Sequence, residues 1–304
     1  LLVQGVDQWV PEVADILKSF DFLPAWRLDD IMVSYAPQGG TVSQHYDFFD
    51  VFLIQGEGAR TWQVGEVCGS HSEYLPDTPV RILKDFKASM EVTLQPGDIL
   101  YVPAKHSHLG VSKEDSLTYS VGFRAPSVRD VVDGVSTSAL EHLLEDDRYQ
   151  DTFASLQAER AEIPDKALQQ VQELLLSAVN NEALVRSWFG QYVTERKYPE
   201  QDDISSDTDA WFERLARGEV LIKHPSARFA YTKEESQPVI KNAILFVDGE
   251  EYWVSYLLAS YLANQYEIDS QYLLDLLTSD SDRVLIESLI VAGALVFEED
   301  LMGE

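Results

Sequence analysis

The spacing of apolar residues divides the chain into a strand-rich first part and a helix-rich second part. Residues 1–20 place apolar side chains mostly three or four positions apart, which predicts a helix. From about residue 27 to 124, Gly, Pro and Asp separate short apolar or alternating runs. Many short strands at this spacing predict an antiparallel barrel or sandwich. The expected strands are 31–35, 49–55, 61–64, 90–94, 99–102 and 117–123.

Beyond Pro126 the apolar spacing becomes helical. Helices are predicted around 131–144, over 168–179 and, in a shorter form, around 188–192. The polar stretch 200–209 holds five acidic residues and is typical of a linker. The remainder mixes strands and helices in an order that suits a winged-helix-like domain. Its strands are expected at 220–222, 229–231, 239–246 and 294–297, and its helices near 253–264, 270–277 and 282–292.

These changes of pattern predict four regions and a mainly β fold with α additions. Residues 1–125 form the β core and residues 126–199 a helical region. Residues 200–217 form an acidic linker with a short helix, and residues 218–304 form the winged-helix-like domain. A chain of 304 residues has room for about two such globular domains.

Acidic residues outnumber basic ones by 52 to 23, which gives a formal charge of −29. The first 125 residues hold 17 acidic and 9 basic residues, whereas the rest of the chain holds 35 and 14. Binding to a phosphate backbone needs a basic face, so direct nucleic-acid binding is not expected. The charge would instead attract a basic protein.

Cys68 is the only cysteine, which excludes an intrachain disulfide and a thiolate-rich metal site. No apolar stretch approaches the ~20 residues of a membrane span, and no signal peptide is visible. We therefore expect no membrane partner and a cytoplasmic protein.

The β core contains histidines and a carboxylate at a spacing that suits a metal. His45 and Asp47 are two positions apart, so on a strand their side chains point to the same face. A second predicted strand ends at Val102, and His106 and His108 follow shortly after it. Two imidazoles and one carboxylate on one face of a metal leave three adjacent positions open, as Fe(II) oxygenases require for co-substrate and O₂.

The two halves of this site match the spacing of the two cupin motifs. The first motif, a Gly, five residues and His-x-Asp, begins at Gly39 and contains the pair just described. The second, a Gly, five residues, Pro, x, Gly, two residues and His, begins at Gly97 and ends at His108, with Lys105 in place of its last Gly. This register selects His108 as the ligand and leaves His106 as a neighbour in the loop. The other histidines are expected at the surface: His71, His142 and His224.

Arg60 is a further candidate for a functional role. It follows the turn that ends at Gly58, so we expect it on a strand that pairs back along the strand after Asp47. An arginine inside a barrel needs an anion, because its guanidinium cannot lose its charge. The anion is either a protein carboxylate, from Asp47 or Asp50, or a substrate carboxylate bound bidentately. Beside the metal-binding residues, a dicarboxylate co-substrate is the favoured interpretation.

Three segments carry a more specific resemblance. Residues 45–62 (HYDFFDVFLIQGEGARTW), 96–103 (PGDILYVP) and 119–126 (YSVGFRAP) are similar to bacterial JmjC-type ribosomal oxygenases, relatives of the human nucleolar histidyl hydroxylases. The resemblance runs through the whole chain. It implies a double-stranded β-helix core, a helical dimerisation region and a C-terminal winged-helix domain. Family members carry residues before the position of Leu1, so the resemblance predicts that residues precede it in the whole protein.

The resemblance also implies a chemistry. It implies a dioxygenase that uses Fe(II), 2-oxoglutarate and O₂, and whose closest family members hydroxylate an arginine β-carbon in the sixteenth protein of the large ribosomal subunit. A basic ribosomal protein is then the expected partner and a homodimer the expected assembly. The implied iron ligands are His45, Asp47 and His108, and the implied co-substrate contacts are Arg60, Thr118 and Ser120.

Two other functions stay open from the residues themselves. A non-oxidative metallo-cupin enzyme would keep the metal-binding residues and use Arg60 in a structural ion pair. A ligand-sensing regulator would read DNA with its winged helix. The charge of residues 219–304, with 16 acidic and 5 basic residues, disfavours the regulator.

Overall fold

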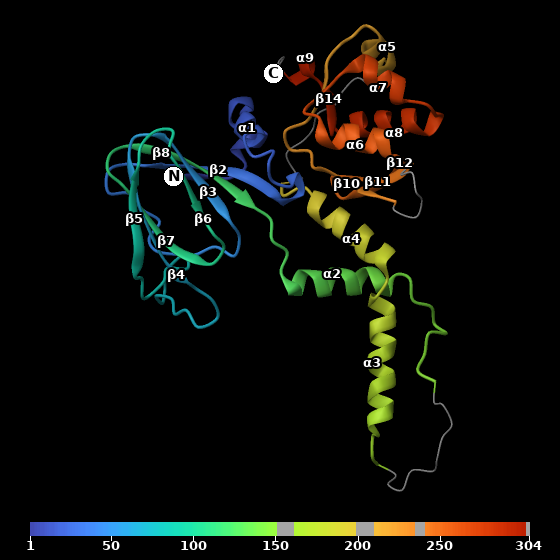
Figure 1. The fold of residues 1–304 in the computed structure, drawn as a ribbon, viewed down its shortest axis with the longest axis horizontal. Coiled ribbons are helices and arrows are strands. Elements are labelled where there is room, and N and C mark those ends of the chain that lie inside the picture. Colours follow the sequence, from blue (N-terminus) through green and yellow to red (C-terminus); the bar gives the residue numbers. More distant parts are fainter. Residues whose placement is uncertain (151–160, 199–209, 235–240, 302–304) are drawn as a thin grey trace.

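Figure 1 shows a barrel, a helical region and a second domain in a computed structural model of the chain. The structure describes residues 1–150, 161–198, 210–234 and 241–301. The linker predicted at 200–209 lies outside these residues. None of the described helices is long and apolar enough to cross a membrane.

Two antiparallel sheets form the walls of the barrel. The larger has the strand order β1-β2-β8-β3-β6 and the smaller the order β5-β4-β7. The chain passes between the sheets at β3–β4, β5–β6, β6–β7 and β7–β8, which is the winding of a double-stranded β-helix and confirms the predicted fold class. The strands are β1 (Leu2–Val3), β2 (Leu28–Ala36), β3 (Val51–Glu57), β4 (Arg60–Val67), β5 (Ala88–Leu94), β6 (Ile99–Val102), β7 (His106–Ser112) and β8 (Ser116–Phe123).

The six strands predicted for the core are present, with ends that differ by a few residues. The remaining long strand, β7, was not predicted. Its alternate positions His108, Gly110 and Ser112 are buried, so the strand presents polar and small residues to the interior where the pattern requires apolar ones. Because the barrel interior is polar at these positions, the apolar periodicity of the sequence does not detect β7.

The predicted pairing of the Arg60 strand is wrong. β4 pairs with β5 and β7, whereas β3, the strand after Asp47, pairs with β6 and β8. Between β3 and β4 the chain crosses to the other sheet at Gly58, whose φ is +60°. A Cβ there would lie 2.1 Å from the carbonyl oxygen of Asp115, so only glycine fits this crossing.

The single helix predicted for residues 1–20 is also wrong. β1 pairs with β2, a 3₁₀ turn follows at Val6–Gln8, and only α1 (Pro11–Lys18) is an α-helix. Gly5 has a φ of +62°, and Pro11 takes the first helical position, where its missing N–H is tolerated. The apolar spacing instead reflects packing of Val13 and Phe20 against the outer face of the larger sheet.

The three predicted helices of the middle region are present. They are α2 (Val128–Leu140), α3 (Asp165–Val179) and α4 (Glu182–Thr194). α2 begins in a capping box between Ser127 and Asp130 and ends before the predicted Leu143 and Leu144. α3 extends away from the barrel and the second domain in Figure 1, and it has no buried residue.

The second domain combines two small sheets with a helical layer. Its sheets have the orders β10-β11-β12 and β13-β9-β14, and its buried core includes Leu245, Leu258 and Ile286. The helix expected near 253–264 begins only at Tyr256, because residues 253–255 belong to β12. The elements are α5 (Trp211–Ala216), β9 (Leu221–Lys223), β10 (Phe229–Lys233), β11 (Asn242–Val247), β12 (Glu250–Ser255), α6 (Tyr256–Asn264), β13 (Glu267–Ile268), α7 (Ser270–Leu276), α8 (Asp280–Val291), β14 (Leu295–Phe297) and α9 (Glu298–Leu301).

His224 corrects one expectation about the surface. It is 7% exposed, and its Nδ1 lies 2.6 Å from the Ser226 hydroxyl inside the second domain. The polar residues around it in the sequence suggested a surface position. The tertiary fold instead buries His224 together with Ser226, and both residues lie in the turn that follows β9.

Charged contacts join the start of β2 to the segment after α4 and to the second domain. Asp29 accepts hydrogen bonds from Arg124 (3.0 Å) and from Lys197 (2.7 Å). Arg228 of the second domain donates to the carbonyl oxygen of Leu28 at 3.3 Å. These contacts hold the segment after α4 and the second domain against the start of β2 in the larger sheet.

Candidate metal centre

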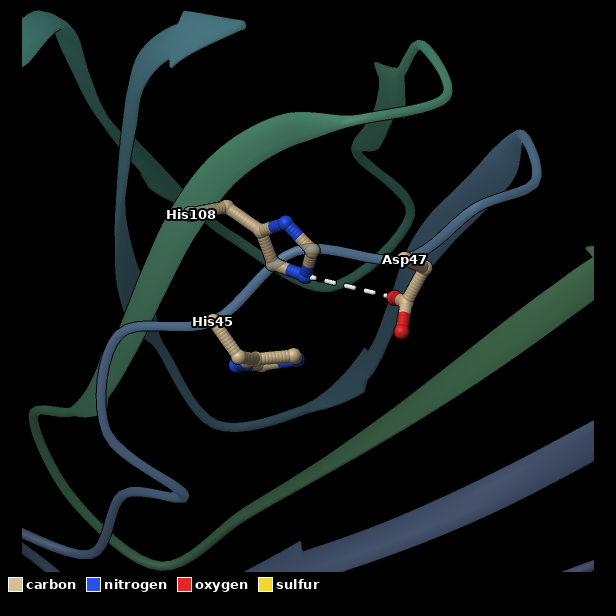
Figure 2. Close-up of side chains that lie close together, drawn as sticks. All are labelled: His45, Asp47 and His108. Atoms are coloured by element: carbon tan, nitrogen blue, oxygen red, sulfur yellow. Dashed lines mark ion pairs between the residues drawn. The ribbon is translucent and has the colours of Figure 1, made fainter. Parts of the chain in front are cut away.

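The structure brings His45, Asp47 and His108 together in the barrel (Figure 2). One potential ligand atom from each residue lies within 4.8 Å of the other two. The two imidazole centroids are 4.3 Å apart, and Nε2 of His108 is 3.7 Å from a carboxylate oxygen of Asp47. Within the described ranges, no other group of three His, Cys, Asp or Glu side chains meets the same spacing.

The main chain sets the positions of the two imidazoles. His45 and His108 form an antiparallel bridge in which each backbone N–H donates to the carbonyl oxygen of the other. Residues that face each other in such a bridge project their side chains to the same side. The strand predicted for residues 45–47 is reduced to this one bridging residue, because Ser43 has a φ of +66° just before it.

Lys105 links the two halves of the site. Its N–H donates to the carbonyl oxygen of Asp47 at 2.7 Å. Its φ is +65°, so the position has the left-handed backbone that the Gly of the cupin motif suits. A lysine in this conformation costs about 1–2 kcal/mol relative to a right-handed one. The substitution therefore retains the turn that the motif requires.

His106 is not part of the cluster, although it lies two positions before His108 on the same strand. In the pairing of β7 with β4, His108 faces Val64 and His106 faces Val67, with a register shift between them. The extra residue of this bulge lies on β4, between Val64 and Val67, so the two histidines keep alternate positions on β7. Such positions lie about 6.6 Å apart along a strand, and of the two only His108 has a ligand atom within reach of His45 and Asp47.

Hydrogen bonds orient both imidazoles. Nδ1 of His45 faces the carbonyl oxygen of Ser43 at 2.9 Å, and Nδ1 of His108 faces that of His106 at 3.0 Å. A carbonyl oxygen only accepts, so Nδ1 carries the proton and Nε2 keeps a free lone pair. Burial and the neighbouring His45 lower the pKa of His108, which favours the neutral imidazole that binds metals.

Arg60 is buried in the same barrel and is 6% exposed. Its three guanidinium nitrogens donate to serine hydroxyls, from Nη1 to Ser34 at 2.9 Å, from Nη2 to Ser116 at 3.1 Å and from Nε to Ser112 at 3.2 Å. Burial lowers the pKa of the guanidinium. Neutral hydroxyls orient the group but leave its charge without a counterion.

The internal ion pair considered for Arg60 is absent among the described residues. Asp50 instead pairs with Arg27 at 3.0 Å and accepts a hydrogen bond from Tyr101 at 2.7 Å. Asp47 lies beside His108 in the candidate metal-binding cluster. The buried cation therefore suits an anion that comes from outside the chain.

Thr118 and Ser120 lie on β8 with their side chains buried. The Thr118 hydroxyl donates to the side-chain oxygen of Gln55 at 3.2 Å, and Gln55 is itself fully buried. The sequence did not identify Gln55 or the three serines around Arg60. A signal for part of this set was present, because Ser116, Thr118 and Ser120 alternate with larger side chains on one strand.

A double-stranded β-helix with two histidines and a carboxylate at one point of its interior is the architecture of a cupin. A JmjC domain model matches residues 15–131, and a ROXA-like winged-helix model matches residues 167–296. The chain thus combines a JmjC domain with a ROXA-like winged helix.

Curated relatives have names that indicate a reaction. The chain is 34% identical over 228 residues to the ribosomal protein uL16 3-hydroxylase of Escherichia coli K12, covering 73% of this chain and 60% of that protein. It is 47% identical over 137 residues to a probable ribosomal oxygenase of Haemophilus influenzae, covering 45% and 34%. The chain thus spans less than two thirds of the length of these relatives.

Solved structures match nearly the whole chain. The crystal structure of E. coli YcfD superposes with a TM-score of 0.86 at 29% identity, covering 98% of this chain and 78% of that one. A second structure, described as the ribosomal oxygenase YcfD in complex with cobalt and 2-oxoglutarate, has a TM-score of 0.82 at 28% identity, with the same coverage.

Proposed function

We propose that this chain is an Fe(II)- and 2-oxoglutarate-dependent oxygenase that hydroxylates a side-chain carbon of a large-subunit ribosomal protein. The observation that carries the proposal is the buried Arg60, which lacks a carboxylate partner among the described residues and shares a barrel with two histidines and one carboxylate. A dicarboxylate co-substrate accounts for both features at once.

The donor set fits iron. His45, Asp47 and His108 offer two imidazole nitrogens and one carboxylate oxygen, and this set with open positions is typical of Fe(II) oxygenases. Fe(II) bound there would supply the O₂ activation and the oxidative decarboxylation of 2-oxoglutarate. The carbonyl acceptors at each Nδ1 would hold the two rings in the tautomer that the metal requires.

Arg60 would bind the distal carboxylate of 2-oxoglutarate. Its guanidinium provides parallel N–H donors, and the three serines hold it in one orientation before the co-substrate arrives. The buried setting excludes water and strengthens the ion pair. Thr118 and Ser120 line the same interior and are proposed as further co-substrate contacts.

For the substrate, we propose an arginine of a basic ribosomal protein. The name of the E. coli relative, a uL16 3-hydroxylase, supports the ribosomal protein, and the charge of −29 suits a basic partner. A ribosomal protein substrate in turn supports a cytoplasmic location. The acidic second domain disfavours the DNA-reading alternative, and the lack of a described ion pair at Arg60 disfavours the non-oxidative one.

We also propose a homodimer formed through the predicted helical region 126–199. α2 and α3 expose apolar side chains on the single chain, and an exposed apolar face of this extent is typical of a protein interface. Sedimentation equilibrium tests the assembly. The exposed residues include Val128, Val132, Leu140, Leu168, Val171 and Leu175.

The reaction is tested by anaerobic reconstitution with Fe(II) and 2-oxoglutarate, followed by O₂ and a basic ribosomal protein or peptide. We expect a product heavier by one oxygen atom, together with one succinate for each hydroxylation. If neither the mass shift nor 2-oxoglutarate turnover appears, the oxygenase proposal is wrong.

A further inference from the structure

Trp62 carries a buried hydrogen-bond donor that has no partner among the described residues. The side chain is 5% exposed, and its buried Nε1 makes no hydrogen bond within the described residues. Buried N–H groups are nearly always paired, because an unpaired one loses its hydrogen bonds to water without replacement. An unpaired donor on the wall of the proposed site therefore indicates an acceptor that binds from outside.

Trp62 lies between the two parts of that site, the metal-binding cluster and Arg60. On β4 it follows Arg60 by two residues, so both side chains point into the barrel. Its partner on β7 is Gly110, two residues after His108. The indole centroid is 6.1 Å from the His108 ring centroid and 5.7 Å from Cζ of Arg60. A molecule that reaches from the metal-binding cluster to Arg60 has to pass this ring.

Gly110 allows the indole to take this position. A Cβ at Gly110 would lie 2.7 Å from Cζ3 of Trp62, 2.8 Å from Cη2 and 2.9 Å from Cε3. These atoms form the edge of the indole opposite Nε1. Because these three distances are nearly equal, the added Cβ would lie over the face of the six-membered ring, so β7 packs against the benzo part of the indole and Nε1 is not among the atoms nearest Gly110.

We propose that Trp62 is a further co-substrate-binding residue, whose Nε1–H donates a hydrogen bond to a carboxylate oxygen of 2-oxoglutarate. This inference rests on the proposed function. The bond is charge-assisted and satisfies a donor that is otherwise unpaired. Trp62 thus adds a directional contact between the metal-bound end of the co-substrate and the end held by Arg60.

The first test compares W62F with the wild-type chain. Phenylalanine keeps an aromatic ring on β4 and removes the N–H. We expect 2-oxoglutarate to bind Mn(II)-loaded W62F about 10- to 100-fold more weakly in anaerobic calorimetry, as for loss of a hydrogen bond to a charged group. The affinity for Mn(II) itself should not change. W253F is the matched control, because Trp253 is 64% exposed in the second domain, and it should bind 2-oxoglutarate like the wild type.

The second test does not depend on the folding of the variant. In ¹⁵N-labelled wild-type protein loaded with Zn(II), the indole N–H resonance of Trp62 should shift when 2-oxoglutarate is added. It is assigned by its loss in W62F. If that variant is unfolded, it is assigned by elimination, with each of the other tryptophans replaced in turn.

The outcomes separate the two proposals. A wild-type protein that does not bind 2-oxoglutarate overturns the proposed function. A wild-type protein that binds it overturns only the role of Trp62, if the indole resonance stays in place or a folded W62F binds with unchanged affinity. An internal water as the acceptor for Nε1 would give this second result.

Discussion

His45 and His108 donate backbone hydrogen bonds to each other, at 3.1 Å from His45 N to His108 O and at 2.8 Å in the opposite direction. The two imidazoles of the proposed metal centre are therefore aligned by the main chain, before any metal binds. Preorganisation of this kind reduces the conformational entropy that metal binding would otherwise cost.

Metal affinity is expected to depend on His108 and not on His106. Since His108 supplies one of three proposed ligands, H108A should lower Co(II) affinity by more than the roughly 10- to 100-fold typical of a lost outer-shell partner. H106A is the matched control two positions away and should retain metal and turnover. Calorimetric titration of both variants checks this, and metal loss in H106A alone would show that the register of the second motif is misassigned.

Replacement of Arg60 is expected to weaken 2-oxoglutarate binding while leaving the stability of the fold nearly unchanged. R60Q removes the proposed partner of the distal carboxylate, so the KM for 2-oxoglutarate should rise by at least about tenfold. Because the buried charge has no counterion in the described chain, its removal should cost little or no free energy of unfolding. Urea unfolding beside steady-state kinetics tests both parts. Strong destabilisation with an unchanged KM would instead support a structural role.

The crossing at Gly58 is expected to be far less tolerant than the turn at Gly97. Both have positive φ, +60° and +94°, so alanine strains the backbone at each by about 1–3 kcal/mol. G58A also places a Cβ 2.1 Å from a carbonyl oxygen, whereas a Cβ at Gly97 meets no atom within 4 Å. The midpoint of urea unfolding should therefore fall further for G58A. Equal midpoints would contradict the crossing described for β3 and β4.

The contact of Asp29 with Lys197 is expected to give an acid-sensitive link between β2 and the segment after α4. Although burial raises the pKa of Asp29, its hydrogen bond with Lys197 and the charges of Lys197 and Arg124 lower it overall, below 3.8. A lowered folded-state pKa stabilises the protein above pH 3.8, and this stabilisation is lost as the pH falls through the folded value. Since Lys197 is partly exposed, D29N should cost only roughly 1 kcal/mol at pH 7.

The measurement for Asp29 is the difference in unfolding free energy between wild type and D29N across pH. It should be constant near neutrality and shrink below pH 3.8. E12Q offers a control, because Glu12 is an exposed acidic residue of α1. A difference for D29N that does not change with pH would mean that the carboxylate charge is not the source.

Substrate capture is expected to weaken as salt rises. The charge of −29 attracts a basic protein over a range set by the Debye length, about 10 Å at 0.1 M and about 3 Å at 1 M. The KM for a basic ribosomal protein should therefore increase with ionic strength, whereas the KM for 2-oxoglutarate, bound in the buried interior, should change much less. A substrate KM that is independent of salt would mean that the acidic surface contributes to solubility and not to substrate capture.

Several features of the fold could be predicted from local pattern. Alternation of apolar residues located the strands around Ile31, Leu53 and Val121, because each presents one buried face. β7 escaped this rule, since its inward residues include His108 and Gly110. Strands that line a polar interior lose the very contrast on which such predictions rely.

The residue types and spacing alone identified two histidines, a carboxylate and an arginine with no role in an ordinary apolar core. Only the tertiary structure decided which sheet carries Arg60, that Ser34, Ser112 and Ser116 surround it, and that Trp62 lies beside it. The reason is physical. Side-chain chemistry and alternation are local properties of the chain, whereas strand pairing, and with it every contact across the barrel, depends on where distant segments meet.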